Sequence, residues 1–310
     1  MDKSHLPNIA VIGAGQWGQA LYFALRQKLG AQGCVIASRT PRDIEGFVDL
    51  STALQASYLV MTIPTQQVRG WLQEFFVDHG QKILVASKGI EANSGDFLND
   101  IYGELIPAER LVFLSGPSFA TEVKQGLPTA LVMNSVDEKL ATDFAAMMPS
   151  FIKIYTSTDV IGAEIAGAYK NVIAIASGIC EGLGLGNNAR ASLITRGLAE
   201  MSRFGLFFGA KEQTFMGLSG VGDLCLTASS TMSRNFRVGL GLSQKKSLDQ
   251  ILAELGEVAE GVATAYAIAK LAQKHTLYLP IAYEVHAILE GKDPQESLKD
   301  LLVRKKQGEF

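Results

Sequence analysis

The chain has 310 residues, of which 47% are hydrophobic and 19% are charged, and its formal net charge at pH 7 is −3. A composition this apolar excludes a disordered chain. A net charge so near zero gives no general attraction to nucleic acid or to an anionic membrane surface. The length is sufficient for two domains, each with a core of its own.

The cysteines and the first residues indicate the cellular compartment. Cys34, Cys180 and Cys225 are far apart, show no C-x-x-C spacing and lie in apolar contexts, which predicts reduced, buried thiols and no metal site. The leader MDKSHLP runs directly into a strand-like segment without the apolar stretch of a secretory signal. No uncharged segment is long enough to span a bilayer. We therefore expect a cytoplasmic protein without stable membrane insertion.

Short β-branched runs alternate with helical patterns over the first half of the chain. Strands are predicted at 8–13, 34–39, 58–64, 83–87, 111–116, 129–135 and 151–158, and helices at 16–28, 66–77 and 95–105. Alternation of strands and helices is typical of a mostly parallel sheet with right-handed crossovers. The first half is therefore predicted to be a doubly wound, Rossmann-type sheet.

The pattern changes after about residue 158. The segments 159–184, 188–209, 248–256 and 264–275 all have helical periodicity, and Gly- and Asn-rich breaks separate them. We predict an α/β protein with a dinucleotide-binding Rossmann domain at 1–157 and an all-α domain at 158–310 that binds substrate.

The sequence GAGQWG at 13–18 matches the G-x-G-x-x-G fingerprint directly after the first predicted strand. Gly13 allows a tight turn, Gly15 lets the backbone approach a pyrophosphate, and Gly18 permits close packing of helix on strand. The N–H groups at the start of the following helix can bind the phosphates. The loop therefore predicts a dinucleotide cofactor.

The end of the second strand bears on which dinucleotide is bound. An NAD site usually has a carboxylate there, whereas this chain has Arg39, and Asp43 comes several residues later. Arginine at this place accommodates the 2′-phosphate of NADP. NADPH is favoured, although Arg39 can also be read as a solvated loop residue, and NAD stays open.

Lys170 lies in the otherwise small and apolar run GAYKNVIAIA at 167–176. At helical spacing it shares a face with Ala163, Ala166, Gly167, Ile173 and Ala174. An ammonium on such a face loses hydration that it must recover from other groups. Either the lysine has a chemical role, or its stem is buried and its ammonium reaches solvent.

Further polar residues stand at predicted strand ends or helix starts. They are Lys88 in SKGIE, Gly116 and Ser118 in SGPSFATE, Asp223 in the glycine-flanked turn SGVGD, and Ser233, Arg234 and Asn235 in SRN. Strand ends of a doubly wound sheet open into the ligand crevice, and Pro117 suits the first turn of a helix. Taken singly, these residues can also be helix caps or exposed charges.

Together these segments resemble bacterial-type NAD(P)-dependent glycerol-3-phosphate dehydrogenase. The resemblance rests on GAGQWG, SKGIE, GPSFATEV, EIAGAYKNVIAIASGI, NARASLITRGLAEM, GLSGVGDLCLT, SRN and VAEG, in the family's order over nearly the whole chain. It implies NAD(P)H-dependent reduction of dihydroxyacetone phosphate to sn-glycerol 3-phosphate, which supplies phospholipid synthesis.

The resemblance also assigns roles to residues. It implies that Lys170 is the catalytic acid and base and that Lys88 lies between cofactor and substrate. The substrate-binding positions are Lys88, Gly116, Ser118, Lys170, Asp223, Ser233, Arg234 and Asn235. The cofactor-binding positions are Gly13, Gly15, Gln16, Trp17, Gly18, Arg39, Lys88, Ala120, Arg234, Val258 and Glu260.

These residue types suit the reaction. Hydride transfer to a ketone leaves negative charge on oxygen, which a positioned N–H donor must stabilise and then protonate. Desolvation lowers the pKa of a lysine toward neutrality, which suits proton transfer in both directions. We expect Asp223 to orient the Lys170 ammonium and Thr227 to assist. Arg234 offers a planar fork for the substrate phosphate, beside Asn235.

Two other functions stay open on the sequence alone. One is a lysine-dependent dehydrogenase of the 3-hydroxyacid or 6-phosphogluconate type. Proteins that resemble those enzymes have an asparagine four residues after the lysine, where this chain has Ala174. The other is a non-catalytic NADP-binding redox sensor. The apolar helical domain also predicts a homodimer.

Overall fold

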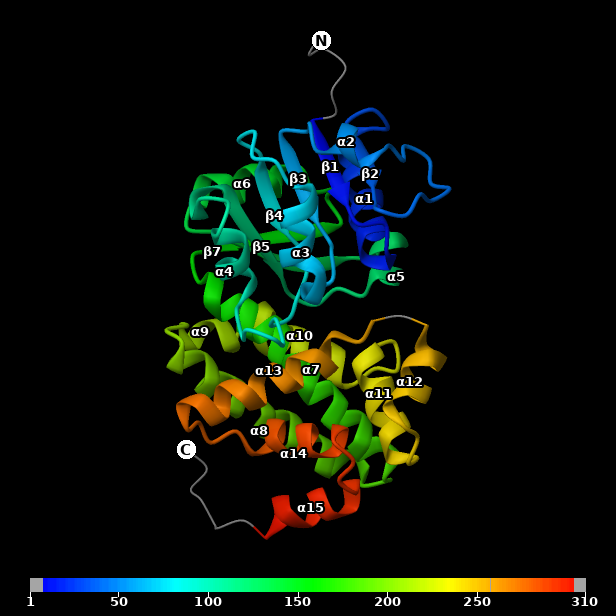
Figure 1. Ribbon diagram of the computed structural model, residues 1–310, viewed down its shortest axis with the longest axis vertical. Helices are drawn as coiled ribbons and strands as arrows, with labels where there is room; N and C mark the ends of the chain where they lie inside the picture. Colours follow the sequence, from blue (N-terminus) through cyan, green and yellow to red (C-terminus); the bar gives the residue numbers. More distant parts are fainter. Residues whose placement is uncertain (1–7, 257, 304–310) are drawn as a thin grey trace.

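The computed structural model describes residues 8–256 and 258–303. It has a sheet part, residues 8–157, and a helical part formed by the described residues from 158 onward (Figure 1). The leader at 1–7 and the segment 304–310, which are the outer ends of the two predicted domains, lie outside the described residues.

One seven-stranded sheet forms the centre of the sheet part. Its strands are β1 (Ile9–Ile12), β2 (Cys34–Ala37), β3 (Tyr58–Met61), β4 (Lys82–Val85), β5 (Leu111–Ser115), β6 (Thr129–Asn134) and β7 (Ile152–Ser157). They are arranged in the order β2-β1-β3-β4-β5-β6-β7. All neighbours are parallel except β5 and β6, which pair antiparallel. The strand order reverses between β1 and β3, because β2 lies on one side of β1 and β3 lies on the other. In such a sheet the ligand crevice lies at the carboxyl ends of the two strands at the reversal.

Both faces of this sheet are buried, which explains why its strands read as continuous apolar runs. Ile9 and Val11 face one hydrophobic cluster, and Ala10 and Ile12 face the other. Helices α1 (Gln16–Leu29), α5 (Ala120–Lys124) and α6 (Glu138–Ala146) contribute to the first cluster. Helices α2 (Leu50–Ala53), α3 (Thr65–Phe75) and α4 (Leu98–Gly103) contribute to the second, and a 3-10 turn at Ala108–Arg110 leads into β5.

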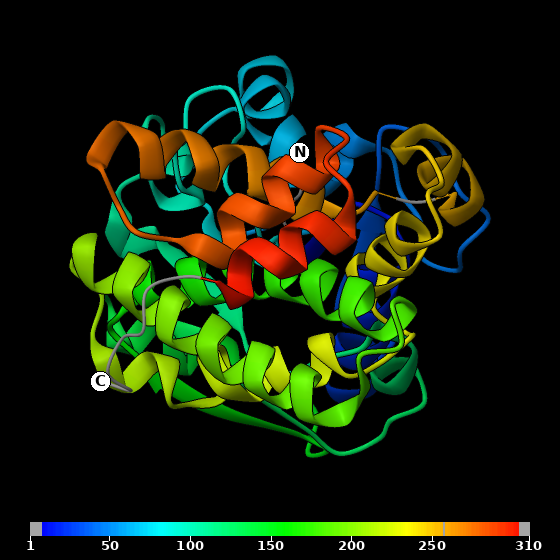
Figure 2. The same ribbon diagram turned by 90° about the horizontal axis from the view of Figure 1, so that it is seen from below.

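The helical part is assembled around α7 (Val160–Gly182). The other helices are α8 (Gly186–Phe207), α9 (Glu212–Phe215), α10 (Asp223–Ala228), α11 (Arg234–Ser243), α12 (Leu248–Leu255), α13 (Glu260–His275), α14 (Pro280–Leu289) and α15 (Pro294–Leu302), with a π-helical turn at Leu218–Gly222. Figure 2 shows the orange and red helices α13–α15 lying together beside the green helices that belong to α7 and α8.

Helix α7 is buried on nearly every side. It is long and apolar enough to cross a membrane by length and composition, but 89% of its most apolar window is buried inside the protein. A helix that is apolar all round and covered by other helices is the core of a globular domain. Any charged side chain on α7 therefore needs a partner inside the protein.

The predicted elements agree with the structure with local exceptions. Every predicted strand is present, and β7 ends at Ser157 shortly before Asp159 caps α7, although the division into two domains remains a prediction. The helix predicted at 95–105 covers only 98–103. Pro117 is not in the first turn of a helix, because α5 begins at Ala120. Cys34 and Cys180 are buried as expected, but Cys225 is exposed, because it lies on the outer side of α10.

Candidate active site

The glycine loop follows β1 and opens α1. Gly13 has φ +110°, and a Cβ there would lie 2.4 Å from Oγ1 of Thr62. A Cβ on Gly18 would lie 1.9 Å from the carbonyl oxygen of Gly13, so neither position accepts a side chain. A Cβ on Gly15 would meet open space, and this face of the loop is where a ligand can reach the backbone. The loop and the N-terminus of α1 thus fit a pyrophosphate.

Other predicted cofactor residues surround this loop. The indole N–H of Trp17 donates to the carbonyl of Ala86 at 3.0 Å, which ties the glycine loop to the segment that follows β4. Gln16 accepts a hydrogen bond at 3.2 Å from Lys124, on the helix that Ala120 begins. Arg39 is exposed directly after β2. These residues lie along the carboxyl ends of β1 and β2, at the place where a dinucleotide fits.

Lys170 contacts two polar side chains at the junction of the two parts. Its ammonium lies 2.9 Å from Oδ1 of Asp223 and 2.8 Å from Oγ1 of Thr227. Asp223 and Thr227 are four residues apart on α10 and therefore share one face of that helix. The ammonium does not reach solvent, since Lys170 is only 8% exposed. The alternative in which this lysine extends to bulk water is therefore excluded.

Lys88 reaches the same carboxylate from the sheet part. Its ammonium lies 2.7 Å from Oδ2 of Asp223 and donates to the carbonyl of Gly116 at 3.1 Å. Gly116 has φ +105° directly after β5, and Ser118 donates to the Gly116 carbonyl at 3.2 Å. Lys88 is thus not a surface lysine, and Asp223 is not merely a helix cap. Ser118 does not cap α5 either, since Phe119 holds that position.

Burial and charge set the protonation of this cluster. Burial lowers the pKa of Lys170 to about 8, although Asp223 opposes the shift, and the charges of Lys88 and Arg234 lower it further. Burial alone would raise the pKa of Asp223. The charges and hydrogen bonds of Lys170 and Lys88 outweigh the effect of burial and hold the pKa of this carboxyl below its ordinary value. At pH 7 the cluster is therefore a carboxylate between two ammonium groups, one of which releases its proton near neutrality.

The SRN segment begins α11 as predicted. Ser233 is the N-cap and accepts a hydrogen bond from the Phe236 N–H at 3.3 Å, so its hydroxyl already serves the helix. Oδ1 of the buried Asn235 accepts the N–H of Gly261 at 3.0 Å and ties α11 to α13. Arg234 is half-buried, and its charge acts on both Lys170 and Glu260. Arg234 therefore lies between the lysine cluster and the start of α13.

Glu260 begins α13 and contacts the sheet part. Its Oε1 accepts the backbone N–H of Thr65, at the start of α3, at 3.0 Å. Its Oε2 is buried and has no hydrogen-bond partner among the described residues. Burial raises the pKa of Glu260 to about 7. An unsatisfied carboxyl oxygen at this junction fits a donor from a cofactor. Val258, the other predicted cofactor residue of this segment, is half-exposed.

The structure adds residues that the sequence analysis did not identify. Gln66 and Arg69 of α3 hold the segment that carries Lys88. Gln66 donates to the Ile90 carbonyl at 2.8 Å, and Nε of Arg69 lies 3.1 and 3.0 Å from the two carboxylate oxygens of Glu91. Glu164 is a second buried charged side chain on α7. The signal that drew attention to Lys170, a charge on an apolar helix, was equally present at Glu164.

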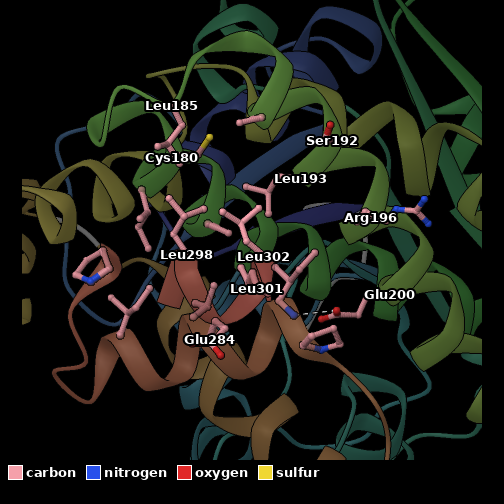
Figure 3. A pocket seen from close by; sticks show the side chains of 18 of the residues that line it. Cys180, Leu185, Ser192, Leu193, Arg196, Glu200, Glu284, Leu298, Leu301 and Leu302 are labelled. Carbon is pink, nitrogen blue, oxygen red and sulfur yellow. Dashed lines mark hydrogen bonds between the residues drawn. The ribbon is translucent and has the colours of Figure 1, made fainter. Parts of the chain in front are cut away.

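A cavity of about 520 Å³ lies between α7, α8, α14 and α15 in the helical part. Figure 3 shows Leu193, Leu298, Leu301 and Leu302 pointing into it. Its lining is mainly aliphatic and includes no predicted site residue. Among the described residues there is also no group of three His, Cys, Asp or Glu side chains that could hold a metal ion. The lysine cluster is therefore the strongest candidate for a catalytic centre.

Comparison with known proteins gives a consistent result over nearly the whole chain. Family models described as the N-terminus and the C-terminus of NAD-dependent glycerol-3-phosphate dehydrogenase match residues 30–141 and 159–299. A protein of Sulfurimonas denitrificans named glycerol-3-phosphate dehydrogenase (NAD(P)+) is 62% identical over 96% of this chain and 99% of its own length. A protein of the same name from Campylobacter jejuni strain RM1221 is 58% identical over 95% of this chain and 98% of its own length.

A solved structure gives the same relation in three dimensions. The crystal structure of glycerol-3-phosphate dehydrogenase from Coxiella burnetii superposes with a TM-score of 0.87 at 33% identity. The superposition covers 96% of this chain and 98% of the other. The fold predicted from the alternating pattern, a mostly parallel sheet followed by helices, is thereby confirmed.

Proposed function

The chain belongs to the NAD-dependent glycerol-3-phosphate dehydrogenase family, and we propose that Lys170, Lys88 and Asp223 form its catalytic centre. The protein is an oxidoreductase that uses NAD or NADP to interconvert dihydroxyacetone phosphate and sn-glycerol 3-phosphate. Its product is the backbone for glycerophospholipid synthesis. The assignment of roles to individual residues is our proposal.

Lys170 is the acid in ketone reduction. Its ammonium is fixed by Asp223 and Thr227, so an N–H can point at the carbonyl oxygen of the substrate without reorganisation. As negative charge develops on that oxygen, the ammonium stabilises it and then transfers its proton. In the reverse direction the neutral amine accepts the proton of the alcohol. A pKa of about 8 allows both steps near neutral pH.

The glycine loop would hold the cofactor in this proposal. The loop at Gly15 and the N-terminus of α1 would bind the pyrophosphate, and Arg39 would bind the 2′-phosphate of NADP. Glu260, with one unsatisfied oxygen, accepts a donor of the cofactor. When bound, the dihydronicotinamide supplies a hydride to the ketone carbon.

The substrate phosphate is held by α11. Arg234 provides a planar guanidinium for two parallel hydrogen bonds. Asn235 contributes through its amide group, and the N–H groups at the start of the helix favour an anion. Lys88 shares Asp223 with Lys170 and, in this proposal, also donates to the substrate between the phosphate and the ketone.

The observation that carries the proposal is the buried contact of Lys170 with Asp223 at 2.9 Å. Replacing Lys170 by methionine keeps the stem and removes the ammonium. We expect the turnover of dihydroxyacetone phosphate with NADPH, followed by the loss of nicotinamide absorbance, to fall about 10²- to 10⁴-fold. The exposed Lys139→Met variant on α6 is the matched control and should retain the wild-type rate.

The same assay separates the two alternatives. A Lys170→Met variant with normal turnover would remove the proposed role of this lysine. Faster turnover of acidic ketones than of dihydroxyacetone phosphate would favour a dehydrogenase of the 3-hydroxyacid type. Tight NADPH binding without turnover of any ketone would favour a redox sensor.

We also propose that the protein acts in the cytoplasm as a homodimer joined through its helical part. Large apolar side chains are exposed there at Leu206, Phe207, Tyr278 and Tyr283. Exposed apolar residues of this size are typical of an interface between subunits.

A further inference from the structure

Glu164 is a buried carboxyl on α7, the helix that also carries Lys170. Its Oε1 accepts the backbone N–H of Asn99, at the start of α4, at 3.0 Å. Its Oε2 is buried and has no partner among the described residues. Burial raises the pKa of Glu164 well above its ordinary value and so favours the protonated carboxyl, which has an O–H to donate. An unsatisfied buried oxygen is costly, and packing alone does not require one.

A small cavity of about 10 Å³ lies beside Glu164. The cavity is lined by residues of four segments: Ala163 and Glu164 of α7, Leu98 of α4, Phe113 and Leu114 of β5, and Ser87, Lys88 and Gly89 after β4. A space of this size holds one water molecule where polar groups line it. Glu164 and the segment 87–89 thus line one small cavity.

The Lys88 side chain runs along α7 from this cavity toward Asp223. A Cβ on Gly167, one turn after Glu164, would lie 3.3 Å from Cγ and Cδ of Lys88. The lysine stem therefore lies on the helix surface, and its ammonium reaches Oδ2 of Asp223 at 2.7 Å. A shift of the segment 87–89 moves this ammonium relative to the carboxylate.

We propose that Glu164 is a positioning residue that binds one water in this cavity and through it holds the segment 87–89 on α7. Lys88 then stays in contact with Asp223. This inference rests on the proposed function, because it gives a second residue of α7 a part in the same centre. The Asn99 N–H accounts for one oxygen of this carboxyl, and the proposed water accounts for the other.

The pH dependence of the reaction reports the position of Lys88. Three charged groups face the Lys170 ammonium, namely Asp223 of α10, Arg234 of α11 and Lys88. Lys88 lowers the pKa of Lys170, so its displacement raises that pKa. Asp100 of α4 acts on Glu164, whereas the charges that act on Lys170 are those of Asp223, Lys88 and Arg234. A change at Glu164 therefore reaches the pH profile only through Lys88.

The test compares variants of Glu164 in the intact enzyme. Glu164→Ala should lower kcat/KM for dihydroxyacetone phosphate about tenfold to a hundredfold and move the basic limb of the pH profile upward by about half a pH unit. Glu164→Gln keeps an acceptor for Asn99 and a donor for the water, so it should remain within about twofold of the wild type with an unshifted limb. If Glu164→Ala folds poorly, Ala163→Ser can replace it, because the added hydroxyl fills the same cavity and leaves Glu164 in place. Ala163→Ser should shift the basic limb of the pH profile in the same direction.

Asp159→Ala is the matched control. Asp159 is another buried carboxylate that caps α7, but it bonds Lys211 and Thr214 within the helical part. It should lower the melting temperature without moving the limb. A merely structural Glu164 would behave as Asp159 does, and the Glu164→Ala limb would then coincide with that of the wild type.

Introducing Glu164→Ala into the Lys88→Met variant tests whether Glu164 acts through Lys88. If Glu164 acts through Lys88, then Glu164→Ala shifts the limb no further in that background. Equal shifts in both backgrounds would overturn the inference. Its failure is distinct from a failure of the proposed function, which would appear as normal turnover in Lys88→Met and Lys170→Met alone.

Discussion

At the scale of single residues, the centre has more positive than negative charge. Lys88 and Lys170 both bond the one carboxylate of Asp223, and Arg234 lies close enough to affect the pKa of Lys170. A buried excess of positive charge is unfavourable without a counter-charge. The phosphate of the substrate and the charge that develops on the ketone oxygen supply that negative charge. The site is therefore electrostatically complete only when substrate is bound.

Arg234 and Arg237 provide a matched pair for testing the phosphate anchor. Both lie in the first turn of α11, but Arg234 is half-buried toward the lysine cluster and Arg237 is exposed. Because a phosphate would lose its charged partner, Arg234→Ala should weaken substrate binding by about 2–5 kcal/mol and raise KM thirtyfold or more. Arg237→Ala should leave KM unchanged.

Steady-state kinetics with dihydroxyacetone phosphate measure this difference. The assay should include Lys170→Met, for which we expect a large fall in kcat and a smaller change in KM. Comparable, mild effects of Arg234→Ala and Lys170→Met on both constants would contradict this division between anchoring and proton transfer.

At the scale of elements, two helices must cross closely for the site to form. A Cβ on Gly178 of α7 would lie 2.0 Å from the carbonyl of Phe236, and a Cβ on Gly239 of α11 would lie 2.0 Å from the carbonyl of Ile175. These contacts involve backbone, so neither helix can yield by turning a side chain. The crossing fixes Arg234, at the start of α11, relative to Lys170 on α7.

Gly178→Ala should therefore destabilise the protein and misplace the anchor. Moving two packed helices apart costs roughly 1–3 kcal/mol of unfolding free energy, as for other overpacked cores. We expect a lower melting temperature together with a raised KM. Gly70→Ala, in the interior of α3 with open space around it, is the control and should raise the melting temperature slightly, because alanine favours a helix. Equal melting temperatures of Gly178→Ala and the wild type would show that the crossing tolerates a methyl group.

The elements also show what the sequence can and cannot predict. The strands were predictable because both faces of the sheet are buried, which makes each strand a continuous apolar run. The four-residue helix α2 was not predicted, since so short a segment completes little more than one period, and α5 begins three residues later than Pro117 indicated. Cys225 was expected to be buried from its apolar neighbours, yet Asp223 and Thr227 rather than Cys225 face inward on α10.

Within the site, the residue types were predictable and the contacts were not. Lys170 and Asp223 stood out by their local patterns, and the structure brings them together. That Lys88 binds the other oxygen of the same carboxylate depends on how the two parts of the chain meet, which no local pattern encodes. The helix-capping role of Ser233 was predictable from its position before α11.

At the scale of the whole molecule, several of the polar contacts that join the two parts lie at the site. Lys88 bonds Asp223, Asn99 bonds Glu164, and Thr65 bonds Glu260. A ligand that binds between the parts is therefore in contact with the groups that hold them together. Cofactor and substrate should accordingly stabilise the whole molecule rather than one part.

The burial of Glu260 at the junction of the two parts makes the stability of the whole molecule depend on pH. Burial raises the pKa of Glu260 from an ordinary 4.5 to about 7, so the folded protein keeps this proton when the unfolded chain has lost it. The contribution is fully present below pH 4.5 and is lost as the pH rises to about 7. Over this range it lowers the unfolding free energy by about 1.4 kcal/mol per pH unit.

Glu260→Gln removes this titration and keeps an acceptor for the Thr65 N–H. Urea unfolding of the cofactor-free protein at pH 5 and pH 7 should show a smaller loss of unfolding free energy in the variant than in the wild type, by about 2–3 kcal/mol. Glu164 and Glu200 also have raised pKa values, but they contribute equally to both proteins and cancel in the difference. The exposed Glu109→Gln variant should follow the wild type. Parallel pH dependence in Glu260→Gln and the wild type would mean that Glu260 is already ionised in the folded protein, and that the junction between the two parts is open enough to hydrate its carboxylate.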